Sequence, residues 1–88
     1  MWSSGEAVVL QTNLLKGNQQ IRIHPSSQLK YPAVLPSGSV GEIIENSGRE
    51  LFVKFMLRKP ARWEQPFLAD NTVYVTIPLS LAWTLKKA

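Results

Sequence analysis

The chain has 88 residues, of which 44% are hydrophobic, and this length and composition predict one small folded domain over residues 1–88 rather than a disordered segment. Cysteine is absent and no apolar run approaches the ~20 residues of a membrane span, which excludes disulfides, thiolate zinc sites and membrane insertion and favours a cytoplasmic location. Ten Lys and Arg against six Asp and Glu give a net charge of +4, which favours acidic partners without selecting their class.

The first part of the chain predicts two short strands and then a long loop. Residues 6–10 are mostly apolar, and residues 20–24 alternate isoleucine with polar residues, which is the two-residue period of a half-buried strand. Residues 25–39 are rich in proline and serine and predict a long surface loop, a common place for binding residues. The side chains expected to tether this loop to the core are Tyr31, Val34 and Leu35.

The middle of the chain predicts a β-hairpin. Val40–Ile44 forms the first apolar run, residues 46–48 read Asn-Ser-Gly, and Leu51–Phe55 alternates in the second run. Gly48 is expected to adopt a positive φ in the turn. Gly41 is expected to permit a close approach or a bulge in a curved strand.

The last part of the chain predicts a second long loop, a strand and a short end. Residues 56–70 contain Pro60 and Pro66, which argue against a helix or a central strand. Thr72–Ile77 alternates cleanly and predicts a strand. Residues 79–81 fit one turn of 3₁₀ helix, followed by a strand over residues 82–86; a helix over residues 79–87 is the open alternative.

Together these elements predict an all-β fold of about five strands that closes on itself, since closure removes exposed strand edges. The residues expected in its core are Val8, Leu10, Ile21, Ile23, Val40, Ile43, Leu51, Val53, Phe55, Val73, Val75, Ile77, Leu81 and Trp83.

The element order resembles a small SH3-like barrel with two long loops and a short 3₁₀ turn near the C-terminus. The resemblance rests on Gly38–Ile44, Leu51–Phe55 and Tyr74–Leu81, because in small SH3-like proteins a glycine-flanked strand pairs with the next strand and a 3₁₀ turn leads into the last one. Among these proteins the chain is similar to accessory subunits of photosynthetic electron-transfer complexes: the E subunit of photosystem I, the variable chain of ferredoxin–thioredoxin reductase and the S subunit of the NDH-1 complex. That similarity implies a docking or shielding role without catalysis, often beside acidic ferredoxin. KOW-type modules of ribosomal and transcription proteins share the glycine-containing hairpin.

The titratable residues predict no enzyme, metal site or cofactor site. His24 is the single histidine, and no carboxylate lies at ligand spacing from it. Glu42 and Glu45 are expected on opposite sides of their strand. Glu50 lies across the turn from Glu45, and pairing with Arg49 or Lys54 and a role in acid–base chemistry are equal alternatives for it. Solvated surface carboxylates are the simpler interpretation.

One cationic loop is the predicted binding site. Arginine and lysine attract carboxylates and phosphates, and an exposed tryptophan can enter a partner's pocket or stack on a base. The predicted site residues are Arg58, Lys59, Arg62 and Trp63, with Lys86 and Lys87 adding to the same field. The preferred partner is an acidic protein or a larger complex; a nucleic acid is the alternative. In a third interpretation Trp63 folds onto the core and the cations are only solvated, and the oligomeric state is left open.

Overall fold

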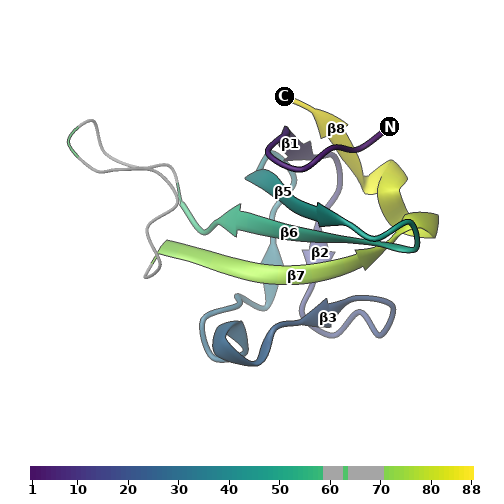
Figure 1. Cartoon of the computed structure of the whole chain (residues 1–88). Helices are drawn as coiled ribbons and strands as arrows, with labels where there is room; N and C mark the ends of the chain where they lie inside the picture. Colours follow the sequence, from purple (N-terminus) through teal and green to yellow (C-terminus); the bar gives the residue numbers. More distant parts are fainter. Residues whose placement is uncertain (59–62, 64–70) are drawn as a thin grey trace.

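The structure is a computed structural model that describes residues 1–58, 63 and 71–88, and these residues form an antiparallel β fold (Figure 1). The strands are β1 (Ala7–Leu10), β2 (Leu14–Leu15), β3 (Arg22–Ile23), β4 (Val34–Leu35), β5 (Val40–Asn46), β6 (Glu50–Met56), β7 (Thr72–Pro78) and β8 (Leu85–Lys87). The structure also contains the 3₁₀ helices η1 (Pro25–Ser27) and η3 (Leu79–Thr84). The all-β prediction is therefore confirmed.

Six strands form one sheet in the order β3-β7-β6-β5-β1-β8, and β2 pairs with β4 in a separate two-stranded ladder. The centre is the meander β5-β6-β7, in which every strand has seven residues (Figure 1). Among the described strands, β3 and β8 do not pair with each other, so hydrogen bonding does not close the sheet into the expected barrel. Both edge strands are very short, which limits the exposed edge that closure would have removed.

A β-bulge in β5 changes which side chains share a face. Ile43 pairs with Val53, but the next pair along is Glu45 with Phe52, so one extra residue lies between them. Glu42 pairs with Lys54, and Glu45 pairs with Phe52. Lys54 and Phe52 are two residues apart on β6 and so share a face, and their partners Glu42 and Glu45 therefore lie on that same face of the sheet. The expectation that they point to opposite sides is wrong for this reason. The turn at residues 46–48 is as predicted, with φ of 90° at Gly48.

Residues 11–39 form an ordered excursion rather than only loops. They contain β2, β3, η1 and β4, and they contribute Leu14, Tyr31 and Leu35 to the core. Burial of Tyr31 and Leu35 confirms two of the three expected tethers, whereas Val34 is exposed. The fully or almost fully buried hydrophobic residues are Val8, Leu10, Leu14, Ile21, Tyr31, Leu35, Ile43, Leu51, Val53, Phe55, Val73, Val75, Ile77 and Leu85.

The C-terminal segment differs most from its prediction. The 3₁₀ helix η3 continues to Thr84, so the last strand begins only at Leu85. The helical rotation leaves Trp83 64% exposed and brings Leu85 into the core in its place. Three further residues expected in the core are only half-buried: Ile23, Val40 and Leu81.

Candidate functional site

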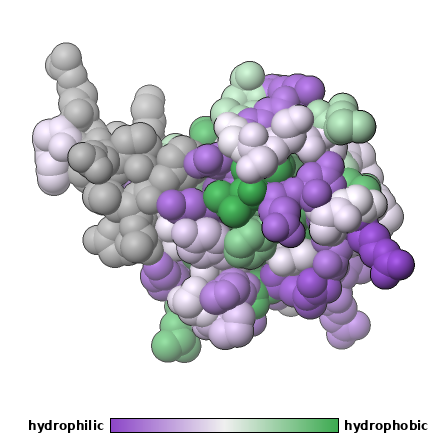
Figure 2. All heavy atoms as spheres, viewed as in Figure 1, coloured by the Kyte–Doolittle hydropathy of each residue, from purple (hydrophilic) through white to green (hydrophobic). Residues whose placement is uncertain are grey.

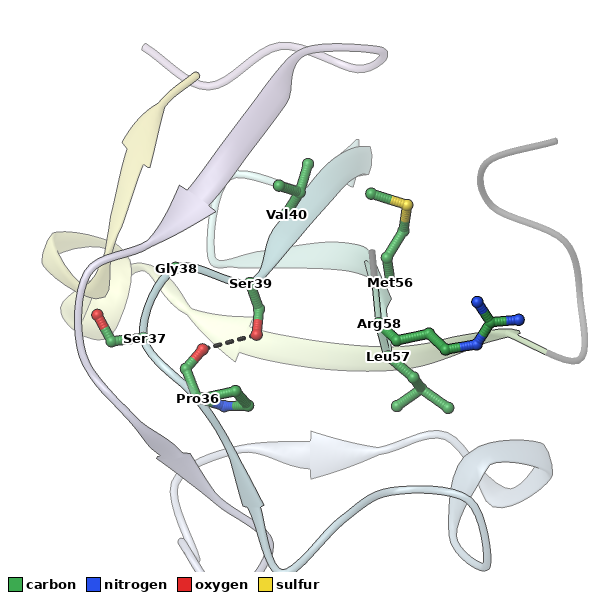
Figure 3. A pocket seen from close by; sticks show the side chains of 8 residues that line it. All are labelled: Pro36, Ser37, Gly38, Ser39, Val40, Met56, Leu57 and Arg58. Carbon is green, nitrogen blue, oxygen red and sulfur yellow. Dashed lines mark hydrogen bonds between the residues drawn. The ribbon is translucent and has the colours of Figure 1, made fainter. Parts of the chain in front are cut away.

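A groove of about 540 Å³ opens where β5 begins and β6 ends. Its described lining residues are Pro36, Ser37, Gly38, Ser39, Val40, Met56, Leu57 and Arg58. Figure 3 shows residues 36–39 on one side of the groove and residues 56–58 on the other. Two segments that are far apart in the sequence therefore meet at this site.

The wall made by residues 36–39 is held by its own hydrogen bonds. The Gly38 N–H donates to the Leu10 carbonyl at 2.7 Å, and the Ser39 N–H donates to the Pro36 carbonyl at 3.1 Å. The Ser37 N–H donates to Asn13 Oδ1 at 2.9 Å. Gly38 has φ of 93°, a conformation that glycine adopts without strain. Because these N–H groups already have acceptors, the wall offers no backbone cradle for an anion.

The floor of the groove is apolar and its rim carries a charge. Val40, Met56 and Leu57 are half-buried, and Leu57 also packs against the core. Arg58 is exposed and is the one charged residue among the described lining residues. An apolar floor with one guanidinium at its rim fits an aliphatic side chain next to a carboxylate.

The strand next to the groove contains unpaired polar atoms. The Leu57 N–H donates to the Asn71 carbonyl at 2.9 Å, which extends the β6–β7 ladder towards the groove. Asn71 Nδ2 and Thr72 Oγ1 are buried and have no hydrogen-bond partner among the residues that the structure describes. Such groups cost free energy, so this end of the ladder is less stable than its centre.

The predicted cationic site is only partly assembled. Arg58 lies at the groove, and Trp63 is 85% exposed, so Trp63 does not fold onto the core. Lys59 and Arg62 lie outside the described residues. Lys86 and Lys87 lie on β8, which β1 and β5 separate from β6 (Figure 1). Lys87 Nζ is 2.9 Å from Glu6 Oε2. Because most of the cationic loop lies outside the described residues, the expectation that these two lysines contribute to its charge stays a prediction.

The sequence interpretation missed an aromatic cluster on the outer face of the sheet. The rings of Phe52 and Tyr74 stack with centroids 5.5 Å apart, and the His24 ring lies 6.3 Å and 6.1 Å from them. Lys54 Nζ lies 5.7 Å from the Tyr74 ring centroid. The outward positions of Phe52 and Tyr74 could be inferred from strand alternation, but His24 joins them only through the pairing of β3 with β7.

Charges of both signs surround this cluster. Arg22 Nη1 donates to Glu50 Oε2 at 2.5 Å and Nη2 donates to Oε1 at 3.0 Å. Glu42 lies opposite Lys54 in the ladder, and Glu45 lies opposite Phe52. A cleft of about 190 Å³ lies beside them, lined by Arg22, Glu45, Ser47, Glu50, Phe52 and Thr76. Because Glu50 is paired with Arg22, Glu42 and Glu45 are the carboxylates of this face that oppose the approach of a polyanion.

The ion pairs predict a loss of stability in acid. The hydrogen bond from Arg22 lowers the pKa of Glu50 from its ordinary value of 4.5. The hydrogen bond from the Ser3 N–H is the largest cause that lowers the pKa of Glu6 from the same value, and the hydrogen bond from Lys87 is the second. A carboxyl group whose pKa is lowered by folding binds more protons in the unfolded chain than in the folded protein. The stability that these two ion pairs contribute is therefore present above pH 4.5 and is lost as pH falls through the folded-state pKa values. Thermal unfolding between pH 7 and pH 3 should show a smaller fall in Tm for the double variant E6Q/E50Q than for the wild type. Equal falls would contradict this assignment.

His24 has a local structural role. The Ser26 N–H donates to His24 Nδ1 at 3.2 Å, and Ser26 Oγ lies 2.7 Å from the same nitrogen, so the ring caps η1. Within residues 1–58, 63 and 71–88, no three His, Asp or Glu side chains come together to hold a metal ion. No helix in this part of the chain is long and apolar enough to cross a bilayer.

Comparisons of the chain with protein-family models, with curated proteins and with solved structures found no match. The geometry of the groove and of the aromatic cluster is therefore the basis for assigning a function.

Proposed function

We propose that this protein is a non-enzymatic interaction module, a small accessory subunit that docks an acidic segment of a protein partner in a cytoplasmic setting. The groove that Arg58 borders carries the proposal, because it combines an apolar floor with a positive rim. A volume of about 540 Å³ is within the ~300–1,000 Å³ typical of ligand sites. One or two aliphatic side chains of a partner fit into it.

The proposed mechanism has two steps. The net charge of +4 attracts an acidic surface and raises the rate of encounter. An aliphatic side chain of the partner then fills the groove over Val40 and Met56 while a neighbouring carboxylate pairs with Arg58. Lys59, Arg62 and Trp63 follow Arg58 in the chain and extend the cationic and aromatic contact.

We also propose that the fold is SH3-like, and two features support this. The glycine-bounded strand β5 pairs with β6, and the 3₁₀ helix η3 leads directly into the last strand β8. Both are the features on which the resemblance to small SH3-like accessory subunits was based. A docking role is the function that such subunits share.

A nucleic acid is the second candidate partner, and the rings of His24, Phe52 and Tyr74 favour it. Aromatic side chains that reach the surface stack on bases; the His24 ring is exposed, and the Phe52 and Tyr74 rings are half-buried. The carboxylates of Glu42 and Glu45 lie on the same face and repel phosphates, which favours the acidic protein instead. Titration with single-stranded and duplex oligonucleotides at ~50 mM salt, where phosphate contacts are strongest, tests this candidate. Binding that weakens steeply as salt rises would establish it, and a flat titration excludes it.

Reversing the charge of Arg58 tests the groove. An N- and C-terminally blocked peptide that alternates leucine with glutamate is the probe, followed by ¹H–¹⁵N NMR. The peptide should shift the amide signals of residues 37–40 and 56–58, and R58E should weaken binding by at least about fivefold, since one partly exposed ion pair is worth up to ~1 kcal/mol and reversal adds repulsion.

The matched control is R49E, which changes the net charge equally. Arg49 is exposed in the turn between β5 and β6, at the opposite end of β6 from Arg58. Its variant should keep most of the affinity for the peptide. Equal losses in both variants, or no shift at the groove residues, would show that the groove is not the docking site.

A further inference from the structure

The excursion between β1 and β5 has an unusual composition. Residues 11–39 contain three Lys and Arg residues and His24 but no Asp or Glu, whereas all six acidic residues lie elsewhere in the chain. Arg22 pairs with Glu50 of β6, and Lys16 and Lys30 are the other two cations of this segment. The segment therefore contributes positive charge and no acidic side chain to the surface.

The same segment exposes three aliphatic side chains. Leu15 is 52% exposed and Val34 is 40% exposed, and the two are direct partners in the β2–β4 ladder, on the side opposite buried Leu14 and Leu35. Leu29, in the turn after η1, is 99% exposed. We call Leu15, Val34 and Leu29, with Lys16 and Lys30, the excursion patch.

Hydrogen bonds bring the members of the excursion patch together. The Lys16 N–H donates to the Ala33 carbonyl at 3.0 Å, next to Val34. Lys16 Nζ donates to the Gln28 carbonyl at 2.6 Å, next to Leu29. The lysine that follows Leu15 thus joins both of the other aliphatic positions.

Leu29 projects from an anchored turn. The Lys30 and Tyr31 N–H groups both donate to the Ser27 carbonyl, at 3.2 Å and 2.9 Å, and Gln28 Nε2 donates to the Ile23 carbonyl at 3.1 Å. Figure 2 shows isolated hydrophobic atoms projecting at the lower edge of the molecule, beside the position of η1 in Figure 1. The backbone therefore holds an apolar side chain in solvent instead of letting it fold back.

We propose that the excursion patch adsorbs to the surface of an anionic lipid bilayer. Lysines attract the negative headgroups, and Leu29 enters the boundary between headgroups and acyl chains. A single projecting side chain suits a soft lipid surface better than a protein partner, which would need a matching pocket for it. The protein lies on the membrane without spanning it, and the groove at Arg58 belongs to a separate surface.

Sedimentation with large vesicles tests this proposal, using vesicles of phosphatidylcholine alone and of phosphatidylcholine with phosphatidylglycerol in equal parts. The protein should bind the anionic vesicles, release them as salt rises, and leave the neutral vesicles unbound. L29Q should lower the partition coefficient about tenfold, the scale of burying much of one leucine side chain. K16E/K30E should lower it by more than tenfold, because each lysine near the surface contributes about fivefold.

W83Q is the matched control, since Trp83 is also an exposed hydrophobic residue but lies on η3 outside the excursion patch. It should partition like the wild type, and L29Q should still bind the acidic peptide at the groove. The proposal is overturned if the protein does not bind anionic vesicles at low salt. It is equally overturned if L29Q and the wild type partition alike, because charge alone would then explain adsorption.

Discussion

Replacing Gly41 with alanine is expected to lower the free energy of unfolding by about 1–3 kcal/mol, the usual cost of overpacking a core. A Cβ at this position would lie 2.8 Å from Phe55 Cδ1, 3.0 Å from Phe55 Cε1 and 3.2 Å from the Lys54 carbonyl oxygen. Phe55 is fully buried and Lys54 contributes backbone, so neither moves away readily. The ~0.4–1 kcal/mol that alanine gains by restricting the unfolded chain is smaller than this clash. Urea unfolding should show a lower midpoint with an unchanged m-value.

Two further variants separate the clash from other effects of the glycine. In G17A the new Cβ would meet no atom within 4 Å, so its midpoint should equal or slightly exceed that of the wild type. In G41A/F55L the smaller side chain should relieve part of the clash, so the double variant should be more stable than the sum of the two single changes predicts. A wild-type midpoint for G41A would contradict the close packing of β5 against Phe55.

Replacing Tyr31 with alanine is expected to lower the free energy of unfolding by about 3–5 kcal/mol, the range for removing a buried aromatic side chain. Tyr31 is buried, and its hydroxyl donates to the Leu14 carbonyl at 3.1 Å. The ring joins the β3–β4 connection to β2, so its loss should loosen residues 11–39 most. Hydrogen exchange should show faster exchange there than in β5, β6 and β7. A loss below ~1 kcal/mol would contradict the role of Tyr31 as the anchor of the excursion.

The buried Tyr31 hydroxyl predicts that the protein loses stability at high pH. Burial raises the pKa of Tyr31 above its ordinary value of 10. Because the folded state favours the neutral phenol, the stability is complete below pH 10 and falls above it, by at most about 1.4 kcal/mol per pH unit from this group. Y31F should lose about 1 kcal/mol at pH 7 but show a flatter decline above pH 10. Parallel declines in both proteins would show that another group dominates.

The hairpin of β5 and β6 shows how far sequence reasoning reaches. The alternation in residues 51–55 and the Asn-Ser-Gly turn gave the right strands and the positive φ of Gly48. The bulge after Ile43 was placed by neither pattern, because it depends on how the two strands pair. It moves Glu45 onto the face of Glu42, and so changes the charge beside the aromatic cluster.

The candidate site was predictable only in part. Arg58 and the exposed Trp63 were singled out because cations and an indole cluster in the sequence. The groove beside Arg58 was missed, since five of its eight described lining residues come from residues 36–40, which approach residues 56–58 only in the folded sheet. The order of the strands could not be read from the sequence either, and it places β5 and β1 between β6 and the strand that carries Lys86 and Lys87.

Local periodicity and turn chemistry determined the class of this protein: apolar residues two apart make strands, and glycine and proline end them. Those signals involve neighbours along the chain, so they can be read without the fold. Tertiary pairing decided the rest, including the open sheet, the outward rotation of Trp83, the groove at Arg58 and the ladder that presents the excursion patch. These features depend on contacts between residues far apart in the chain, whose free energies override local preference.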